Sequence, residues 1–170
     1  MSQENEKEST NYFQIYWRLY GGWPALLSSK YLWFSVIFSV VCSPLWTSEE
    51  DGERPWASAA VEIIPSLMAF SLGAMAILLA FSNERFMEKV QEKGKAKSLY
   101  MLATASFFHF ILLQTISLFC VILLQAYTVH FISAIGFFFM IYGMCVAVST
   151  AGILLRMAQI FNLLAAIPKK

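Results

Sequence analysis

The sequence predicts an all-α polytopic membrane protein: a four-transmembrane-helix bundle preceded by an N-terminal amphipathic segment at the membrane interface. Apolar residues make up 58% of the 170-residue chain, against about 45–50% in soluble domains. Residues 99–155 contain no Asp, Glu, Lys or Arg, which fits two membrane spans joined by a short turn better than one soluble core helix. Residues 59–81 form another apolar stretch that is long enough to cross a bilayer core.

The first part of the chain predicts a tail, an interfacial segment and a short span. Residues 1–10 are polar and acidic, so we expect a mobile tail. Residues 11–28 combine aromatic side chains with Arg18, which is typical of a segment in the headgroup layer. We expect Gly21 and Gly22 to break the helix of this segment. The alternative for this segment is a docking helix for a soluble partner. Residues 29–46 form the first span, in which Pro44 ends or kinks the helix.

The remaining chain predicts three further spans and two charged segments. The second span covers residues 59–81, and the charged connector 82–98 follows it. The third span covers residues 99–127 and the fourth covers 131–157, so only a tight turn separates them. Residues 158–170 form a basic C-terminal end at the interface.

Small side chains recur along one face of the second span. Glu62 is followed at heptad-like spacing by small residues, namely Ser66, Ala69, Gly73, Ala76 and Ala80. The fourth span carries a similar ridge, namely Gly136, Gly143, Ala147 and Ala151. In lipid, small residues let helix backbones approach closely and so drive association. We therefore expect the two ridges to pack together, or to support self-association or binding of another membrane chain.

The distribution of basic residues predicts the orientation. Of the twelve Lys and Arg residues, only Arg54 lies between the first and second spans, and all others flank the opposite side. By the positive-inside rule, both termini and the connector are cytoplasmic, in a plasma (inner) membrane. We also expect the helix of the second span to continue to Gly94. The connector is either a solvated segment or a surface for anionic lipid or a cytoplasmic protein, through Arg85, Lys89, Lys93, Lys95 and Lys97.

A few polar side chains lie within the spans and are candidate functional residues. Glu62 either complements the positive end of its helix or forms a ring at the mouth of an oligomeric pore, where it attracts cations. His109 either hydrogen-bonds across a helix interface or passes protons. Gln114 and Ser117 either bond to neighbouring helices or line a wet path. Together with Ser66, these are the pore or polar-path candidates.

Motifs of familiar enzymes are missing from the sequence. It contains no HExxH, no Gly-rich phosphate loop and no GxSxG, so we expect no catalytic residues. Two histidines and three cysteines without ligand spacing predict no metal site and no cofactor. A net charge of +1 argues against a nucleic-acid partner. The bilayer itself is the expected environment.

Three functions remain open from the sequence. The first is an oligomeric channel or pore-like protein lined by the second span. The second is a non-conducting anchor or sensor subunit that docks a cytoplasmic partner. The third is a small transporter that uses His109, for which an inverted repeat between the two halves would be expected but is not evident.

Overall fold

The computed structural model describes residues 11–47, 54–80, 84–92, 95 and 98–165. Every regular element in these ranges is an α-helix. The helices are α1 (Tyr12–Tyr20), α2 (Gly22–Leu27), α3 (Lys30–Val41), α4 (Ser43–Thr47), α5 (Pro55–Ala80), α6 (Glu84–Gln91), α7 (Leu99–Ala126) and α8 (His130–Ala165). The all-α prediction is confirmed for this part of the chain.

Three helices are long and apolar enough to cross a membrane, which indicates an integral membrane protein. They are α5 with 26 residues, α7 with 28 and α8 with 36. At 1.5 Å per residue the shortest is about 39 Å long and α8 about 54 Å, against about 30 Å of hydrocarbon. The predicted second, third and fourth spans fall on these three helices.

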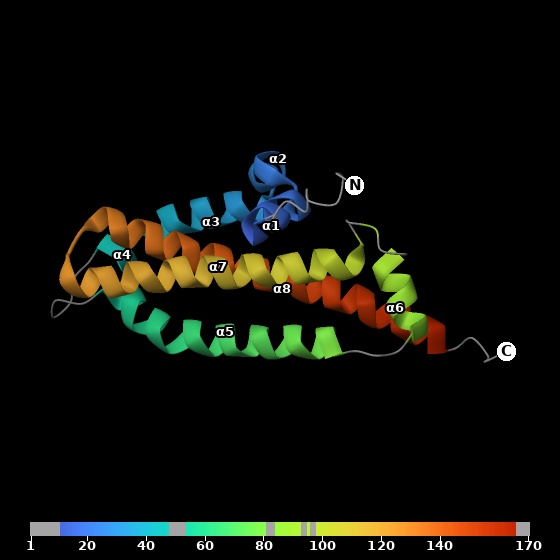
Figure 1. Ribbon diagram of the computed structural model, residues 1–170. Helices are drawn as coiled ribbons and strands as arrows, with labels where there is room; N and C mark the ends of the chain where they lie inside the picture. The colour runs from blue at the N-terminus through green and yellow to red at the C-terminus, as the bar shows by residue number, and fades with distance from the viewer. Residues whose placement is uncertain (1–10, 48–53, 81–83, 93–94, 96–97, 166–170) are drawn as a thin grey trace, which may run out of the picture.

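The α7–α8 hairpin forms the centre of the bundle. α5 lies along α7, and α3 followed by α4 lies along α8 (Figure 1). α1, α2, α6 and the C-terminal end of α8 lie toward one end of the molecule, and the α7–α8 turn lies at the other (Figure 1). α8 is much longer than the hydrocarbon layer is thick, and α6 packs on its C-terminal part.

The predicted first span is divided into two short helices. α3 has 12 residues, so it is about 18 Å long and does not cross the hydrocarbon layer alone. The helical backbone hydrogen bonds of α3 end at Cys42, and Pro44 in α4 has no N–H with which to continue them. The predicted kink at Pro44 is therefore close to the observed break, but the four-span count is not confirmed.

The N-terminal segment packs on the bundle. Asn11 caps α1 by accepting a hydrogen bond from the Phe13 N–H, at 3.2 Å. Gly21 ends the helix with a φ of 101°, which glycine adopts without a steric penalty. Tyr16 is buried and α1 contacts α7. The break at Gly21 was expected from the sequence, whereas the placement of the segment in the headgroup layer is not confirmed.

The connector contains a separate helix rather than a continuation of the second span. α6 lies at a steep angle to α5, across the ends of α7 and α8 (Figure 1). Phe86 and Val90, four residues apart, are buried in one apolar cluster with Phe107 and Met157. The expectation that α5 runs on to Gly94 is therefore wrong. The gain from burying this apolar face against α7 and α8 outweighs the gain from extending a solvated helix.

Candidate functional site on the outer face of α5

The small-residue stripe of α5 faces away from the rest of the chain. Glu62 and the five small residues that follow it at heptad-like spacing are all exposed. The buried residues of the same span, among them Ala60, Ile64 and Leu78, lie on the opposite side of the helix at 100° per residue. A Cβ atom added at Gly73 would meet no atom within 4 Å. The stripe is thus an open surface along most of α5.

Two rows of large apolar side chains border the stripe. One row has spacings of seven residues and the other has spacings of eleven and then seven, so each follows the stripe along the helix. One row is Ile63, Phe70 and Ile77, and the other is Val61, Leu72 and Leu79. All six are exposed, and Phe70 is 77% exposed. The outer face of α5 is therefore a shallow trough with a floor of small residues and walls of large ones, which a second helix can fill.

The expected packing of this stripe against the ridge of the fourth span is wrong. Gly143 of α8 instead faces the side chain of Gln114 on α7, and Gly136 faces Trp56 and Cys120. α5 packs mainly against α7, and it does so through its large side chains. Trp56 and Ile64 pack closely inside the bundle, and the Trp56 indole N–H donates a hydrogen bond to Ser133, so these contacts hold this face inward. Ala147 is half-buried on α8, and Ala151 is exposed.

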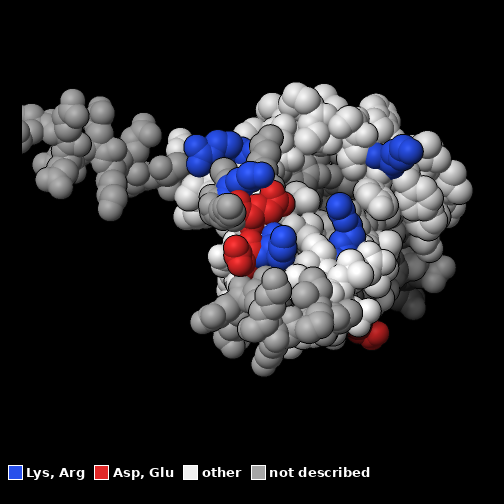
Figure 2. All heavy atoms as spheres, turned by 90° about the vertical axis from the view of Figure 1, so that its right-hand side faces the viewer, with Lys and Arg blue, Asp and Glu red and all other residues white. Residues whose placement is uncertain are grey.

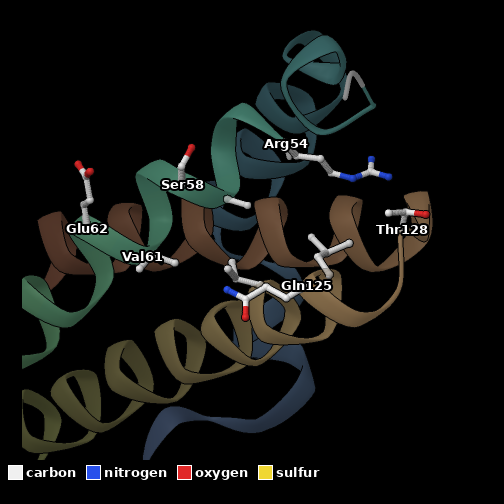
Figure 3. A pocket seen from close by; sticks show the side chains of 9 residues that line it. Arg54, Ser58, Val61, Glu62, Gln125 and Thr128 are labelled. Atoms are coloured by element: carbon white, nitrogen blue, oxygen red, sulfur yellow. The ribbon is translucent and has the colours of Figure 1, made fainter. Parts of the chain in front are cut away.

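A groove lies beside the stripe, between α5 and α7 (Figure 3). Its volume is about 540 Å³. Its lining residues are Arg54, Ala57, Ser58, Val61, Glu62, Val121, Leu124, Gln125 and Thr128. Glu62 lies at one end of the groove and Arg54 at the other, and Val61 points into the space between the two helices (Figure 3). One end of the stripe and one end of the groove thus meet at Glu62.

The buried Arg54 side chain is fixed where α4, α5 and α8 meet. Its Nη1 donates a hydrogen bond to the Trp46 carbonyl and another, 3.1 Å long, to Nδ1 of His130. Ser133 also donates to the Trp46 carbonyl, at 2.7 Å, and accepts from the Trp56 indole N–H at 2.8 Å. These bonds position the start of α5, and with it the groove.

Ser66, another predicted residue, and Pro65 shape the helix next to Glu62. The Ser66 hydroxyl donates a 3.4 Å hydrogen bond to the Glu62 carbonyl, so it turns back on its own helix. Pro65 lies inside α5 and has no N–H for the carbonyl of Val61. The Glu62 carboxylate points away from the body of the bundle (Figure 3).

His109 belongs to a different cluster, at the end of the bundle where α1 packs. Its Nδ1 shares a hydrogen bond with the Tyr16 hydroxyl, and its Nε2 lies 3.4 Å from the Tyr142 hydroxyl. The Tyr20 hydroxyl lies 3.1 Å from that of Tyr142. Both ring nitrogens are thus engaged by phenols, and His109 connects α1, α7 and α8.

The sequence did not indicate the three tyrosines as partners of His109. Tyr16 is 93 positions away from it in the chain, so only the docking of α1 brings them together. Burial, with a smaller contribution from Tyr20, raises the pKa of Tyr16 above its usual value. Its hydroxyl therefore stays protonated and available as a donor at physiological pH. Two features of the sequence could have indicated this contact: the aromatic side chains along one face of α1, and a single histidine in the middle of the apolar helix α7.

Gln114 and Ser117 lie in the packed interior of the α7–α8 hairpin. Ser117 donates a hydrogen bond of 2.9 Å to the Gly136 carbonyl. Gln114 is 0% exposed, and neither of its amide atoms has a hydrogen-bond partner within the described part of the chain. Neither residue is close to the outer stripe of α5. The structure therefore divides the predicted polar-path residues into two groups. Glu62 and Ser66 are exposed on α5, whereas His109, Gln114 and Ser117 are buried.

Charged side chains gather at the end of the molecule that carries α6 (Figure 2). Lys89 is exposed on α6, and Lys95 forms a 3.6 Å salt bridge with Glu92. An exposed pair of this kind contributes little to stability. The side chain of Arg85, together with Lys93 and Lys97, lies outside the described residues, so the predicted basic surface is described only in part.

The described ranges bring together no group of three His, Cys, Asp or Glu side chains that could hold a metal ion. In comparisons with protein-family models, curated proteins and solved structures, the chain finds no match.

Proposed function

We propose that this membrane protein assembles from several copies of the chain and that α5 of each copy lines a cation-conducting pore. One observation carries the proposal: Glu62 and Ser66 head a trough of small residues that faces directly away from the chain's own core. A trough with heptad spacing is self-complementary, since the same face of a second copy can pack into it. A second copy of this chain is therefore the occupant that we assign to it.

The position of Glu62 favours a wet environment for its carboxylate. It lies seven residues after the start of α5, about 10 Å along a helix of about 39 Å. A carboxylate at this depth that faced lipid would cost several kcal/mol, roughly 2.5–3.5 at the bilayer centre and less toward the interface. Around an axis of several copies, the same carboxylates face water and one another and attract cations.

A path inside a single chain is less well supported. Gln114 and Ser117 are 0% exposed, and Ser117 is bonded to the α8 backbone. Both nitrogens of His109 are engaged by tyrosine hydroxyls. These side chains are held in tight interhelical packing, which favours a structural role over a transport path for them.

The proposal includes four crossings with both termini on the cytoplasmic side. α3 and α4 follow one another along α8, from beside α1 and α2 toward the end that carries the α7–α8 turn (Figure 1). Residues 30–47 as two joined helices cover about 27 Å, close to the hydrocarbon thickness. α3 with α4 is thus our candidate for the first crossing.

Recording from purified protein in planar bilayers tests the proposal. We expect cation-selective conductance, and Glu62→Gln should reduce both single-channel conductance and selectivity for cations over anions. Glu88→Gln is the matched control, because Glu88 is exposed on α6 and far along the chain from the stripe. Wild-type protein that forms no conductance, or conductance that Glu62→Gln leaves unchanged, would falsify the pore.

A non-conducting anchor for a cytoplasmic partner is the second candidate function. The observation that favours it is α6, which is fixed on α7 and α8 by Phe86 and Val90 while Glu88 and Lys89 remain exposed. An ordered charged helix at that end can serve as a recognition surface. Capture of a cytoplasmic protein that is lost in the Glu88→Ala/Lys89→Ala variant, in a preparation without conductance, would favour this function.

A further inference from the structure

His109 is buried among aromatic side chains where α1, α7 and α8 meet. Only 4% of it is exposed. Tyr16 and Tyr20 approach its imidazole from α1, with ring centroids 5.8 and 4.3 Å away, and Tyr142 approaches from α8, at 5.7 Å. We propose that α1 is an acid-sensitive latch, which the neutral imidazole of His109 holds on the bundle and which protonation of that imidazole releases.

The hydrogen bonds of this cluster are satisfied by a neutral imidazole. A neutral ring has one nitrogen that donates and one that accepts. The buried Tyr16 hydroxyl can donate to Nδ1, while Nε2–H donates to the Tyr142 oxygen at 3.4 Å and Tyr142 donates to Tyr20 at 3.1 Å. A protonated ring donates from both nitrogens. The hydrogen of the Tyr16 hydroxyl would then lose its acceptor inside the bundle, which is unfavourable.

The described surroundings of His109 offer a charged imidazole no carboxylate. The groups that face the ring are the three phenols. Arg18, the only charged residue of α1, is itself positive, and residues 99–155 of α7 and α8 contain no Asp, Glu, Lys or Arg. The faces of the tyrosine rings attract a cation, but this attraction is weaker than the solvation that a buried charge loses. The docked state therefore disfavours the charged ring.

The structure of α1 suits a detachable element. It has nine residues, fewer than an isolated helix needs to be stable, so it depends on its docking. Gly21 and Gly22 join it to α2 with φ values of 101° and 68°, and α1 can swing about this pair of glycines. His109 lies about 15 Å from the start of α7, in the half of that helix nearest α6. Movement of α1 thus opens a path for water to the ring from that end.

The direction of the pH effect follows from proton binding. The undocked state can bind one proton more than the docked state, so acid favours undocking. An exposed imidazole titrates at about pH 6.5. The ratio of undocked to docked α1 should therefore rise about tenfold between about pH 7.5 and about pH 5.5, and it should change little above that range.

Proteolysis of the full-length protein in nanodiscs measures how often α1 is undocked. The rate of tryptic cleavage after Arg18 is divided, at each pH, by the rate for a free peptide of residues 11–22, which corrects for the pH dependence of the protease. Cleavage tracks the population of the open form when opening and closing are fast. Cleavage after Arg156, which is exposed on α8, reports unfolding of the bundle in the same digest.

Two variants remove the proton but keep hydrogen-bonding groups. His109→Gln and His109→Asn supply neutral amides that both donate and accept. We expect the corrected cleavage rate after Arg18 to rise about tenfold from about pH 7.5 to about pH 5.5 in the wild type and to be independent of pH in both variants. His130→Gln is the matched control, because His130 is the other histidine of the chain and is exposed at the start of α8. It should respond as the wild type does.

A corrected rate that does not change with pH in the wild type overturns the latch. An equal rise in the wild type and in both His109 variants assigns the response to another group, as does loss of the response in His130→Gln, and either result overturns the role of His109. A parallel rise in cleavage after Arg156 shows unfolding of the bundle and overturns the assignment to α1. Because no step involves α5, the outcome is independent of the proposed pore.

Discussion

The hydroxyl of Tyr16 and Nδ1 of His109 share a buried hydrogen bond that ties the N-terminal helix α1 to α7. Tyr16 and His109 also stack, with ring centroids 5.8 Å apart. Tyr20 approaches the same imidazole with a centroid distance of 4.3 Å. One histidine within a long apolar helix thus provides the polar contact for a separate amphipathic segment.

Tyr16→Phe is expected to loosen α1 while leaving the rest of the bundle folded. The phenyl ring keeps the stacking, but Nδ1 of His109 is left buried without this partner, at a cost of about 1–3 kcal/mol. Trypsin should then cut after Arg18 faster than in the wild type. Tyr12→Phe is the control, because Tyr12 is 66% exposed. Equal cleavage rates in the two variants would contradict the role given to this bond.

Gly143→Ala is expected to destabilise the α7–α8 hairpin. The added Cβ would clash with the amide of Gln114, which is fully buried, at a cost of about 1–3 kcal/mol in overpacking. Gly152→Ala on the same helix should be neutral or slightly stabilising, since it meets no atom within 4 Å and alanine favours helix. Thermal unfolding in detergent measures both.

A double variant separates this clash from a general loss of helix packing. Gln114→Ala creates a space beside Gly143, so adding it to Gly143→Ala should cost less than the sum of the two single changes. Strict additivity of the two free-energy changes would argue against direct contact.

Gly73→Leu is expected to reduce assembly without unfolding the chain. Its side chain would project into the outward trough of α5, where nothing of the same chain lies within 4 Å. Gly152→Leu is a close match, because Gly152 is also a helical glycine with nothing within 4 Å. Native mass spectrometry from nanodiscs should show smaller assemblies for Gly73→Leu only. Unchanged stoichiometry in both variants would remove the trough as a self-association surface.

Ser133→Ala is expected to weaken the junction of α4, α5 and α8. It removes the bond to the Trp46 carbonyl and leaves the Trp56 indole N–H buried without its acceptor, at a cost of about 1–3 kcal/mol. A lower melting temperature in detergent should report the loss. Ser28→Ala, at an exposed serine that bonds only locally, should melt as the wild type does.

Labelling of single cysteines tests the predicted orientation. In a variant without the three native cysteines, Lys95→Cys should react with a membrane-impermeant maleimide only after the cytoplasmic side is opened. Thr128→Cys should react from outside intact cells, because Thr128 is exposed in the α7–α8 turn at the opposite end of the bundle (Figure 1). The reverse pattern would show that the positive-inside prediction is wrong for this chain.

The sequence by itself determined the helical class, the three long apolar helices and the break at Gly21. These features depend on local properties: the length of an apolar run against the bilayer thickness, and the conformational freedom of glycine. The division of the first span near Pro44 was anticipated for the same reason, because the missing N–H of proline acts on its own turn.

Only the tertiary structure decided which faces are buried and which polar groups meet. α5 offered both a small-residue stripe and a face with Trp56 and Ile64, and the face that packs and hydrogen-bonds within the bundle turned inward. The partners of His109 come from α1 and α8, and Gly143 faces Gln114 across the hairpin. Such pairings depend on how all the helix surfaces compete to pack in the same interior. They therefore cannot be inferred from any single stretch of the sequence.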